Sequence, residues 1–282
     1  MKEKKDRKRH FDETEDILAC YTMISVYSRI HQIKILEICF MVDHIHILLI
    51  AENPEAMAGF MRDFSSAYVL SLNASTGRSG QLLHKSYGNA PKRGDKKTRS
   101  TIIYIGNNPV EKKLCTRAEG YRWNFLPYIL TPFPYSGKRT LRDMENSIRK
   151  LCKEVQDCRN RNEYLTHDKE FLTDFIVMRY WCMDESAMIS YFKDLKSMIE
   201  AMASTTGSEH DICETFIPEP DTSYHEMTAI IQKVLPGTPV RKIISFSMER
   251  KMKVASFLRQ TTSASFSQIC RFLHIDRKRS TT

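Results

Sequence analysis

The chain has 282 residues, of which 41% are hydrophobic and 27% charged, and its formal net charge at pH 7 is +9. This length and hydrophobic fraction predict a sizeable core, in one domain with an appendage or in two domains. No apolar run approaches the roughly 20 residues that cross a bilayer, so we expect no membrane partner. The lysine- and arginine-rich start has no apolar stretch behind it, unlike a secretory signal. Eight cysteines without a Cys-x-x-Cys pair are typical of reduced thiols, and we expect a cytoplasmic protein.

Positive charge is concentrated in three stretches of the sequence. Residues 85–122 hold ten lysines and arginines against three acidic residues, residues 1–9 hold six against two, and residues 271–279 hold four against one. Basic loops often serve only to keep a protein in solution. Here the largest basic stretch adjoins the candidate chemistry described below, which favours a nucleic-acid partner.

The first half of the chain predicts alternating helices and strands. Apolar residues at helical spacing predict a helix over residues 11–30. Two apolar runs, 33–41 and 44–50, are separated by a break at Val42 and Asp43, which predicts a β-hairpin. Residues 55–73 again show three- and four-residue apolar spacing, typical of an amphipathic helix.

Two histidines lie in the second run of the hairpin, Met41-Val-Asp-His-Ile-His-Ile-Leu-Leu-Ile50. Side chains alternate across a strand, so His44 and His46 should point to the same face. Two imidazoles two positions apart could bind one divalent metal ion from one side. The alternative is a pair of core histidines that only need hydrogen-bond partners.

A basic loop over residues 87–99 precedes Tyr104-Ile-Gly-Asn-Asn-Pro-Val110. Tyr104 and Asn108 are four residues apart and would share one face of a helix. Because a proline disfavours helical geometry in the residue before it, we expect this helix to end near Asn107. A second helix would then start at Pro109, capped by Asn108. In the aromatic cluster that follows, the expected place of Trp123 and Phe125 is the core.

Residues 131–140 contain two prolines and a glycine and predict a linker. Helical spacing dominates residues 141–165 and 168–203, and residues 205–223 predict a loop. The pattern Ser265–Ile275 is similar to the first helix of a helix-turn-helix, but a simple three-helix packing unit fits equally well.

The ordered set of these motifs resembles the single-tyrosine HUH transposases, in particular the REP-associated tyrosine transposase branch. Met41-Val-Asp-His-Ile-His-Ile-Leu-Leu49 is similar to that family's Met-Pro-Asn-His-Val-His-Leu-Leu-Leu, with Asp43 in place of the asparagine. Gly80-Gln-Leu, the basic loop, the Asn-Pro-Val step and Tyr121-Arg-Trp follow in the family's order. The resemblance covers roughly residues 11–130.

The resemblance implies a ferredoxin-like α/β sandwich with an antiparallel sheet, followed here by a mostly helical C-terminal region. We therefore expect a catalytic domain over residues 1–130, a linker over 131–140, and a helical region over 141–282 as a candidate for DNA binding.

It also implies the site. Tyr104 would be the nucleophile, and His44, His46 and Asn108 would hold Mg²⁺ or Mn²⁺. The implied partner is single-stranded or hairpin DNA, and a homodimer is a further expectation. The basic residues expected to bind the DNA backbone are Lys85, Lys92, Arg93, Lys96, Lys97 and Arg99.

The chemistry is consistent with these residue types. A phenol has a pKa of about 10 and needs a nearby cation to act as a nucleophile at neutral pH. A metal ion stabilises the charge that builds on a phosphoryl group under attack. Three functions remain open at this point. The protein is a DNA strand-transferase, a DNA-binding regulator of the same origin without catalysis, or a phosphodiesterase in which water replaces the tyrosine. For Tyr104 itself, the alternative is a helix tyrosine packed on the sheet.

Overall fold

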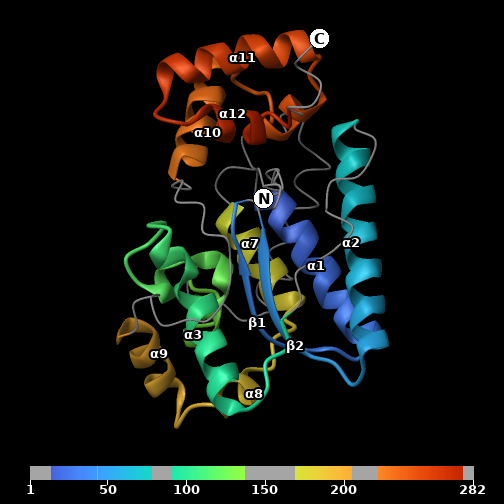
Figure 1. Cartoon of the computed structure of the whole chain (residues 1–282), viewed down its shortest axis with the longest axis vertical. Helices are drawn as coiled ribbons and strands as arrows, with labels where there is room; N and C mark the ends of the chain where they lie inside the picture. Colours follow the sequence, from blue (N-terminus) through green and yellow to red (C-terminus); the bar gives the residue numbers. More distant parts are fainter. Residues whose placement is uncertain (1–13, 43, 78–89, 137–168, 205–221, 276–282) are drawn as a thin grey trace, which may run out of the picture.

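The computed structural model describes residues 14–42, 44–77, 90–136, 169–204 and 222–275. These residues form a mixed α/β fold in which an antiparallel two-stranded sheet is surrounded by helices (Figure 1). This confirms an α/β class with an antiparallel sheet followed by a mostly helical region. Within this described part, no helix combines the length and the apolarity needed to cross a membrane.

The predicted hairpin is present as β1 (Lys34–Phe40) and β2 (Ile45–Ile50). The register places Cys39 opposite His46, and a bulge lies between Ile35 and Glu37. The residues of β1 after Lys34 are all buried, so both faces of this strand are covered. The strand therefore needs apolar side chains on both faces, which its sequence supplies except at Glu37.

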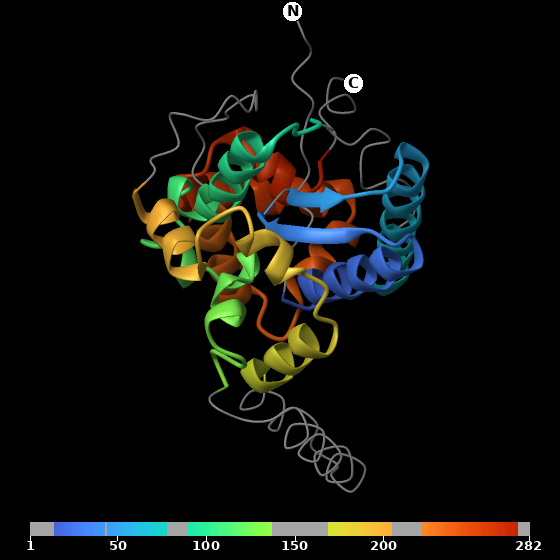
Figure 2. The same cartoon turned by 90° about the horizontal axis from the view of Figure 1, so that it is seen from below.

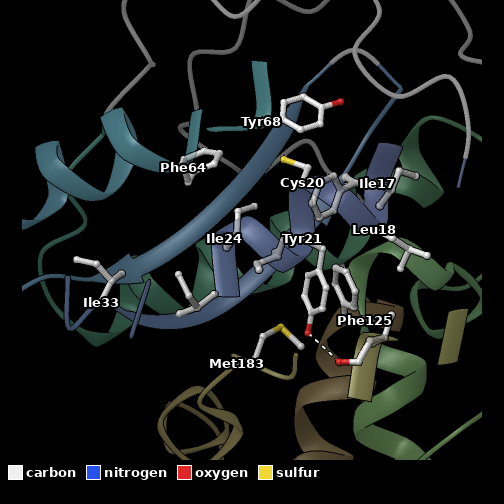
Figure 3. Packing of buried hydrophobic residues seen from close by; sticks show 14 of the residues in the cluster. Ile17, Leu18, Cys20, Tyr21, Ile24, Ile33, Phe64, Tyr68, Phe125 and Met183 are labelled. Carbon is white, nitrogen blue, oxygen red and sulfur yellow. Dashed lines mark hydrogen bonds between the residues drawn. The ribbon is translucent and has the colours of Figure 1, made fainter. Parts of the chain in front are cut away.

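One face of the sheet packs against α1 (Thr14–Ile30) and α2 (Pro54–Thr76), as the helical spacing predicted. The Asn53 side chain accepts a hydrogen bond from the Ala56 backbone N–H at the start of α2, and Gly77 ends the helix in the left-handed conformation. Figure 3 shows the core between these elements, with the Tyr21 hydroxyl donating to the Val177 carbonyl at 3.3 Å.

The other face of the sheet packs against α3 (Asp95–Glu111). Two expectations fail at this helix. The chain does not break before Pro109 but continues as one helix through it, although the proline nitrogen cannot donate a helical hydrogen bond. The basic run is also not all loop, because α3 begins at Asp95 and takes in its last five residues, 95–99. Gly94, with a φ of 82°, makes the turn into the helix.

After α3 the chain forms short helices along the edge of β1. They are the 3₁₀ helices η1 (Ala118–Gly120) and η2 (Arg122–Asn124) and the helix α4 (Leu126–Leu130). The Tyr121 hydroxyl donates to the Phe40 carbonyl at 2.9 Å. Phe125 is fully buried and Trp123 packs partly buried beside it, in the core where the sequence places them.

The helices within residues 169–204 pack into the same two cores as the first half of the chain. These are α7 (Lys169–Arg179), α8 (Glu185–Ile189) and α9 (Leu195–Ser204), within the stretch where helical spacing was predicted. Met183 forms an isolated parallel bridge to Ile35, and the Asp184 N–H donates to the Ile35 carbonyl at 2.7 Å. The division into domains stays a prediction, but residues 169–204 contribute to the cores around the sheet.

Buried Asp174 on α7 holds the start of the predicted linker. Its carboxylate accepts hydrogen bonds from the Tyr128 hydroxyl at 2.8 Å and from the backbone N–H groups of Tyr135 and Ser136 at 3.0 and 2.8 Å. Burial, and then the nearby Asp174 charge, raise the pKa of the Tyr128 phenol. The chain thus stays packed on α7 through Ser136; the rest of the predicted linker and residues 141–165 lie outside the described residues.

The C-terminal helices form a cluster of their own at the top of the view in Figure 1. The elements are α10 (Thr222–Val234), the 3₁₀ helix η4 (Val240–Ser245), α11 (Met248–Thr261) and α12 (Phe266–Phe272). Ser265 and Gln268 form a capping box at the start of α12. Val42, from the turn between β1 and β2, also packs in this cluster. A recognition helix would have to fall on residues 276–282, which lie outside the described residues.

Candidate active site

The two histidines converge at the start of β2. Their Nε2 atoms are 2.9 Å apart, with the rings edge to face at a centroid separation of 4.7 Å. His46 lies in β2 opposite Cys39, on the sheet face that packs against α3, whereas His44 lies just before the strand. The carbonyl of His44 accepts a hydrogen bond from the Met41 N–H at 2.9 Å, which closes the turn. The pair thus shares one face, as the alternation of side chains predicts.

Helix α3 brings Tyr104 and Asn108 to the same imidazole. The Tyr104 ring lies edge to face with the His46 ring, with centroids 5.7 Å apart. The Asn108 Nδ2 is 3.1 Å from the His46 Nε2. Because an amide nitrogen can only donate, the His46 Nε2 is the acceptor of this contact when the Asn108 amide is oriented in this way. Tyr104 and Asn108 therefore do share a helix face that meets the histidines.

The geometry fits one bound divalent ion. Ligand nitrogens about 2.1 Å from a metal ion lie about 3.0 Å apart when they occupy neighbouring octahedral positions, close to the observed 2.9 Å. The Asn108 Oδ1 is buried without a hydrogen-bond partner among the described residues, and rotation of the amide would turn this oxygen toward the histidines. The described part of the chain contains no cluster of three or more His, Cys, Asp or Glu that could hold a metal. The remaining ligands would have to be the amide, water or substrate.

The predicted DNA-binding residues fall into three groups. Arg93, Lys96 and Lys97 are exposed around the first turn of α3, and Lys92 beside them is half-buried. Arg99 is exposed but already engaged, with its Nε donating to the Tyr191 carbonyl at 2.7 Å and its guanidinium 5.8 Å from the Phe192 ring. Lys85 lies outside the described residues. A cluster of cations at a helix N-terminus is a favourable place for a phosphate.

Three residues beside the site were not singled out from the sequence. Glu37 faces α3 from β1 and is fully buried, and burial raises the pKa of its carboxyl well above the usual range. Its neighbour on the same face, Cys39, also has a raised thiol pKa, through burial first and then through Glu37. Asn107 is buried on α3 and donates to the Met202 carbonyl at 2.6 Å. An acidic residue within an otherwise apolar strand was the one available signal for Glu37.

Comparison with known proteins gives a match to a family model. Residues 3–108 match the family described as "Transposase IS200 like". No curated protein and no solved structure matches the chain. The matched segment ends at Asn108 and so includes the histidine pair and Tyr104. The helices that follow lie outside it, and the REP-associated branch stays a prediction.

Proposed function

Residues 3–108 match the IS200-like transposases, and from this match we propose that the protein cleaves and rejoins single-stranded DNA through a 5′-phosphotyrosine intermediate. The family match supports a DNA-processing function in general. The proposal assigns the nucleophile to Tyr104 and the metal ligands to His44, His46 and Asn108.

One observation gives the proposal its main support. The Tyr104 ring lies 5.7 Å from the His46 ring, and the His46 Nε2 lies 2.9 Å from the His44 Nε2. The three side chains come from two elements about sixty positions apart in the sequence and meet on one face of the sheet. A tyrosine that only packed on the sheet could have occupied another position on the sheet-facing side of α3.

The proposed reaction has two reversible steps. The Tyr104 oxygen forms a bond to the scissile phosphorus while the bond from phosphorus to the 3′-oxygen of the preceding nucleotide breaks. The phenolic proton passes to solvent, and the departing 3′-oxygen takes up a proton. Attack of a 3′-hydroxyl on the phosphotyrosine reverses these changes and rejoins a strand.

His44 and His46, with the Asn108 amide, would hold Mg²⁺ or Mn²⁺. When bound, the ion would supply positive charge to the phosphoryl oxygens as negative charge builds on them. Two imidazole ligands suit Mn²⁺ at least as well as Mg²⁺, which prefers oxygen ligands. The Asn108 amide would also keep the His46 ring in one orientation.

The DNA backbone would bind at the first turn of α3. Arg93, Lys96 and Lys97 are exposed there, and the uncapped N-terminus of this 17-residue helix adds its partial positive charge. In this proposal, the phosphate contacts lie on the helix that bears the nucleophile. A hairpin substrate, a homodimer and a cytoplasmic location are part of the same proposal, and the five free cysteines in the described residues are consistent with that location.

A second candidate function is DNA binding without catalysis. It is favoured by the burial of Tyr104, of which only 9% is exposed. A phosphate can reach the phenol only if its surroundings open or if the accessible fraction is the hydroxyl itself. If neither holds, the basic surface would bind DNA and the tyrosine would stay inert.

The test is a cleavage assay with labelled single-stranded hairpin DNA and Mn²⁺. We expect a covalent protein–DNA adduct in the wild type and none in Tyr104→Phe. In His44→Ala, cleavage should fall by at least about a hundredfold while DNA binding persists. Tyr27→Phe, the same change on α1 beyond the opposite face of the sheet, is the matched control and should form the adduct normally.

The outcomes separate the three functions. DNA binding without any cleavage in the wild type would support the non-catalytic alternative. Cleavage that survives Tyr104→Phe would assign the attack to water and overturn the proposed nucleophile.

A further inference from the structure

Helix α3 packs not only against the sheet but also against a segment outside the family match. This segment, residues 185–204, comprises α8, α9 and the turn between them, and is called the positioning arm below. Figures 1 and 2 both show α9 beside α3. The Arg99 Nε donates to the Tyr191 carbonyl at 2.7 Å, and the Asn107 Nδ2 donates to the Met202 carbonyl at 2.6 Å. The two donors are eight residues apart, roughly 12 Å along the helix, and Tyr104 lies between them.

The contact between the arm and α3 is closely packed. Met188, Met198 and Met202 are almost completely buried, in the same apolar cluster as Tyr104. A Cβ at Gly106 would lie only 2.8 Å from the Met202 Cε, so the absence of a side chain at this glycine lets the arm approach α3. The contact is thus built over two helical turns and not at a single point.

The hydrogen bond from Asn107 satisfies a group that has no partner within its own helix. Met202 lies in the last turn of α9, where backbone carbonyls lack intrahelical partners. Asn107 is 5% exposed, so water is a poor substitute for either group. Loss of the amide would therefore loosen the contact and leave a buried carbonyl unsatisfied.

Adjacent residues of α3 face different partners. Asn108 contacts His46 on the sheet, and Asn107 contacts Met202 in the arm. Pro109 within the helix donates no backbone hydrogen bond to the preceding turn, so this turn depends more on outside contacts. The rotation and position of α3 at Tyr104 are set jointly by the sheet and by the arm.

We infer that the positioning arm holds Tyr104 in register with the histidine pair, with Asn107 and Arg99 as positioning residues. The inference rests on the proposed function, in which Tyr104 attacks DNA. It extends the catalytic unit beyond the residues matched by the family, into α8 and α9. Neither Asn107 nor Arg99 touches the reacting atoms; each acts through the placement of α3.

The first test is the rate of adduct formation at saturating hairpin DNA and Mn²⁺. In Asn107→Ala we expect the rate to fall by about tenfold to a hundredfold, because displacement of a reacting group by about an ångström has effects of this size. The DNA dissociation constant should stay unchanged. Arg99→Lys keeps the charge but loses the Nε donor, and should lower the rate in the same direction by a smaller factor.

Arg29→Ala is the matched control. Arg29 is an exposed arginine on α1 that donates to the Trp181 carbonyl at 3.1 Å, a contact of the same kind that does not involve α3. This variant should keep the wild-type rate. An equal loss in Arg29→Ala, or an unchanged rate in both α3 variants, would overturn the inference.

Hydrogen exchange of the full-length protein separates this inference from the proposed function. Asn107→Ala and Arg99→Lys should raise the exchange of amides in residues 95–111 and leave those of α2 unchanged. If the wild type forms no adduct, the proposed function fails and the exchange pattern alone decides on the arm. Wild-type exchange in α3 of both variants would refute its role. Arg99→Lys, a change at an exposed side chain, keeps the test valid if Asn107→Ala does not fold.

Discussion

At the scale of single residues, Glu37 is the most unusual side chain in the sheet. It is fully buried on β1, and neither carboxylate oxygen has a hydrogen-bond partner among the described residues. The bulge between Ile35 and Glu37 turns this side chain toward α3, where its Oε1 lies 3.2 Å from the position of a Cβ at Gly106. An ionised carboxylate in such a place is strongly disfavoured, so the carboxyl stays protonated well above its usual pKa of 4.5.

This predicts the effect of Glu37→Gln on the pH dependence of stability. Below pH 4.5 the carboxyl is protonated in both the folded and the unfolded chain, so it adds no pH dependence. As pH rises toward the raised folded pKa, only the unfolded chain ionises, and Glu37 lowers the free energy of unfolding by about 1.4 kcal/mol per pH unit. The stability of Glu37→Gln relative to wild type should therefore increase between pH 5 and pH 7.

Urea unfolding at several pH values measures this difference. Glu52→Gln, the same change at an exposed glutamate, is the control for the loss of a carboxyl group. A difference between Glu37→Gln and wild type that stayed constant across this range would show that Glu37 is ionised in the folded protein.

The site residues found from the sequence are those whose partners follow from regular spacing. Alternation along a strand puts His44 and His46 on one face, and a four-residue step puts Tyr104 and Asn108 on one side of a helix. Asn107 lay beyond such rules, because its partner is the Met202 carbonyl almost a hundred residues later. The family resemblance, not the spacing, singled out Tyr104 among the tyrosines.

At the scale of elements, a glycine in α2 makes room for a side chain from the turn after α1. A Cβ at Gly59 would lie 2.7 Å from the His31 Cε1 and 2.9 Å from its Nδ1. The His31 Nε2 contacts the Asp63 carboxylate at 2.8 Å, one turn further along α2, so the imidazole is held in place. The helix therefore accepts a residue of low helical propensity to make room for a ring.

The effect of Gly59→Ala on the free energy of unfolding is predicted to change sign when His31 is also replaced by alanine. In the wild type, the added methyl group collides with the imidazole and should lower the free energy of unfolding by about 1–3 kcal/mol. In His31→Ala the ring is gone, and the same change should raise stability by up to about 1 kcal/mol, the advantage of alanine over glycine within a helix.

A double-mutant cycle with chemical denaturation measures both effects. Gly77→Ala, at a glycine with a φ of 65° and no neighbouring atoms within 4 Å of its Cβ position, serves as the comparison. Its cost should come from backbone strain alone and should not depend on His31. Equal effects of Gly59→Ala in both backgrounds would mean that the ring moves aside at no cost.

Element boundaries illustrate what the sequence cannot provide. The helices over α1 and α2 and the hairpin followed from periodicity, since each buries one apolar face. The predicted break before Pro109 was wrong, because burial of α3 between the sheet and the arm stabilises a helix that proline weakens locally. Local preferences cannot report such packing, which comes from residues far along the chain.

At the scale of the whole molecule, the segment after residue 168 completes both cores around the sheet. Val177 and Met183 belong to the cluster beneath α1 and α2, and Met188, Met198 and Met202 belong to the cluster beneath α3. Helical spacing predicted helices here, but an amphipathic pattern does not identify the surface that it covers. The part of the chain most similar to a known family is thus buried in part by residues outside the match.

This predicts how fragments of the chain fold. A fragment of residues 1–136 lacks these five side chains, each worth roughly 1.5–3 kcal/mol when buried, against a total stability of about 5–15 kcal/mol. We expect it to show no cooperative thermal transition, whereas residues 1–204 should unfold in one. Circular dichroism melting of both fragments tests this, and cooperative unfolding of the shorter one at the same temperature would show that the later helices are dispensable.

The position of Val42 has a consequence for how this protein can change over time. This residue lies two positions before His44, yet its side chain packs among the C-terminal helices. Substitutions that reshape that distant bundle would shift the turn from which the first imidazole emerges. The sequence of the C-terminal helices is therefore constrained in evolution, even at positions that contact no nucleic acid, because their core is shared with the turn before His44.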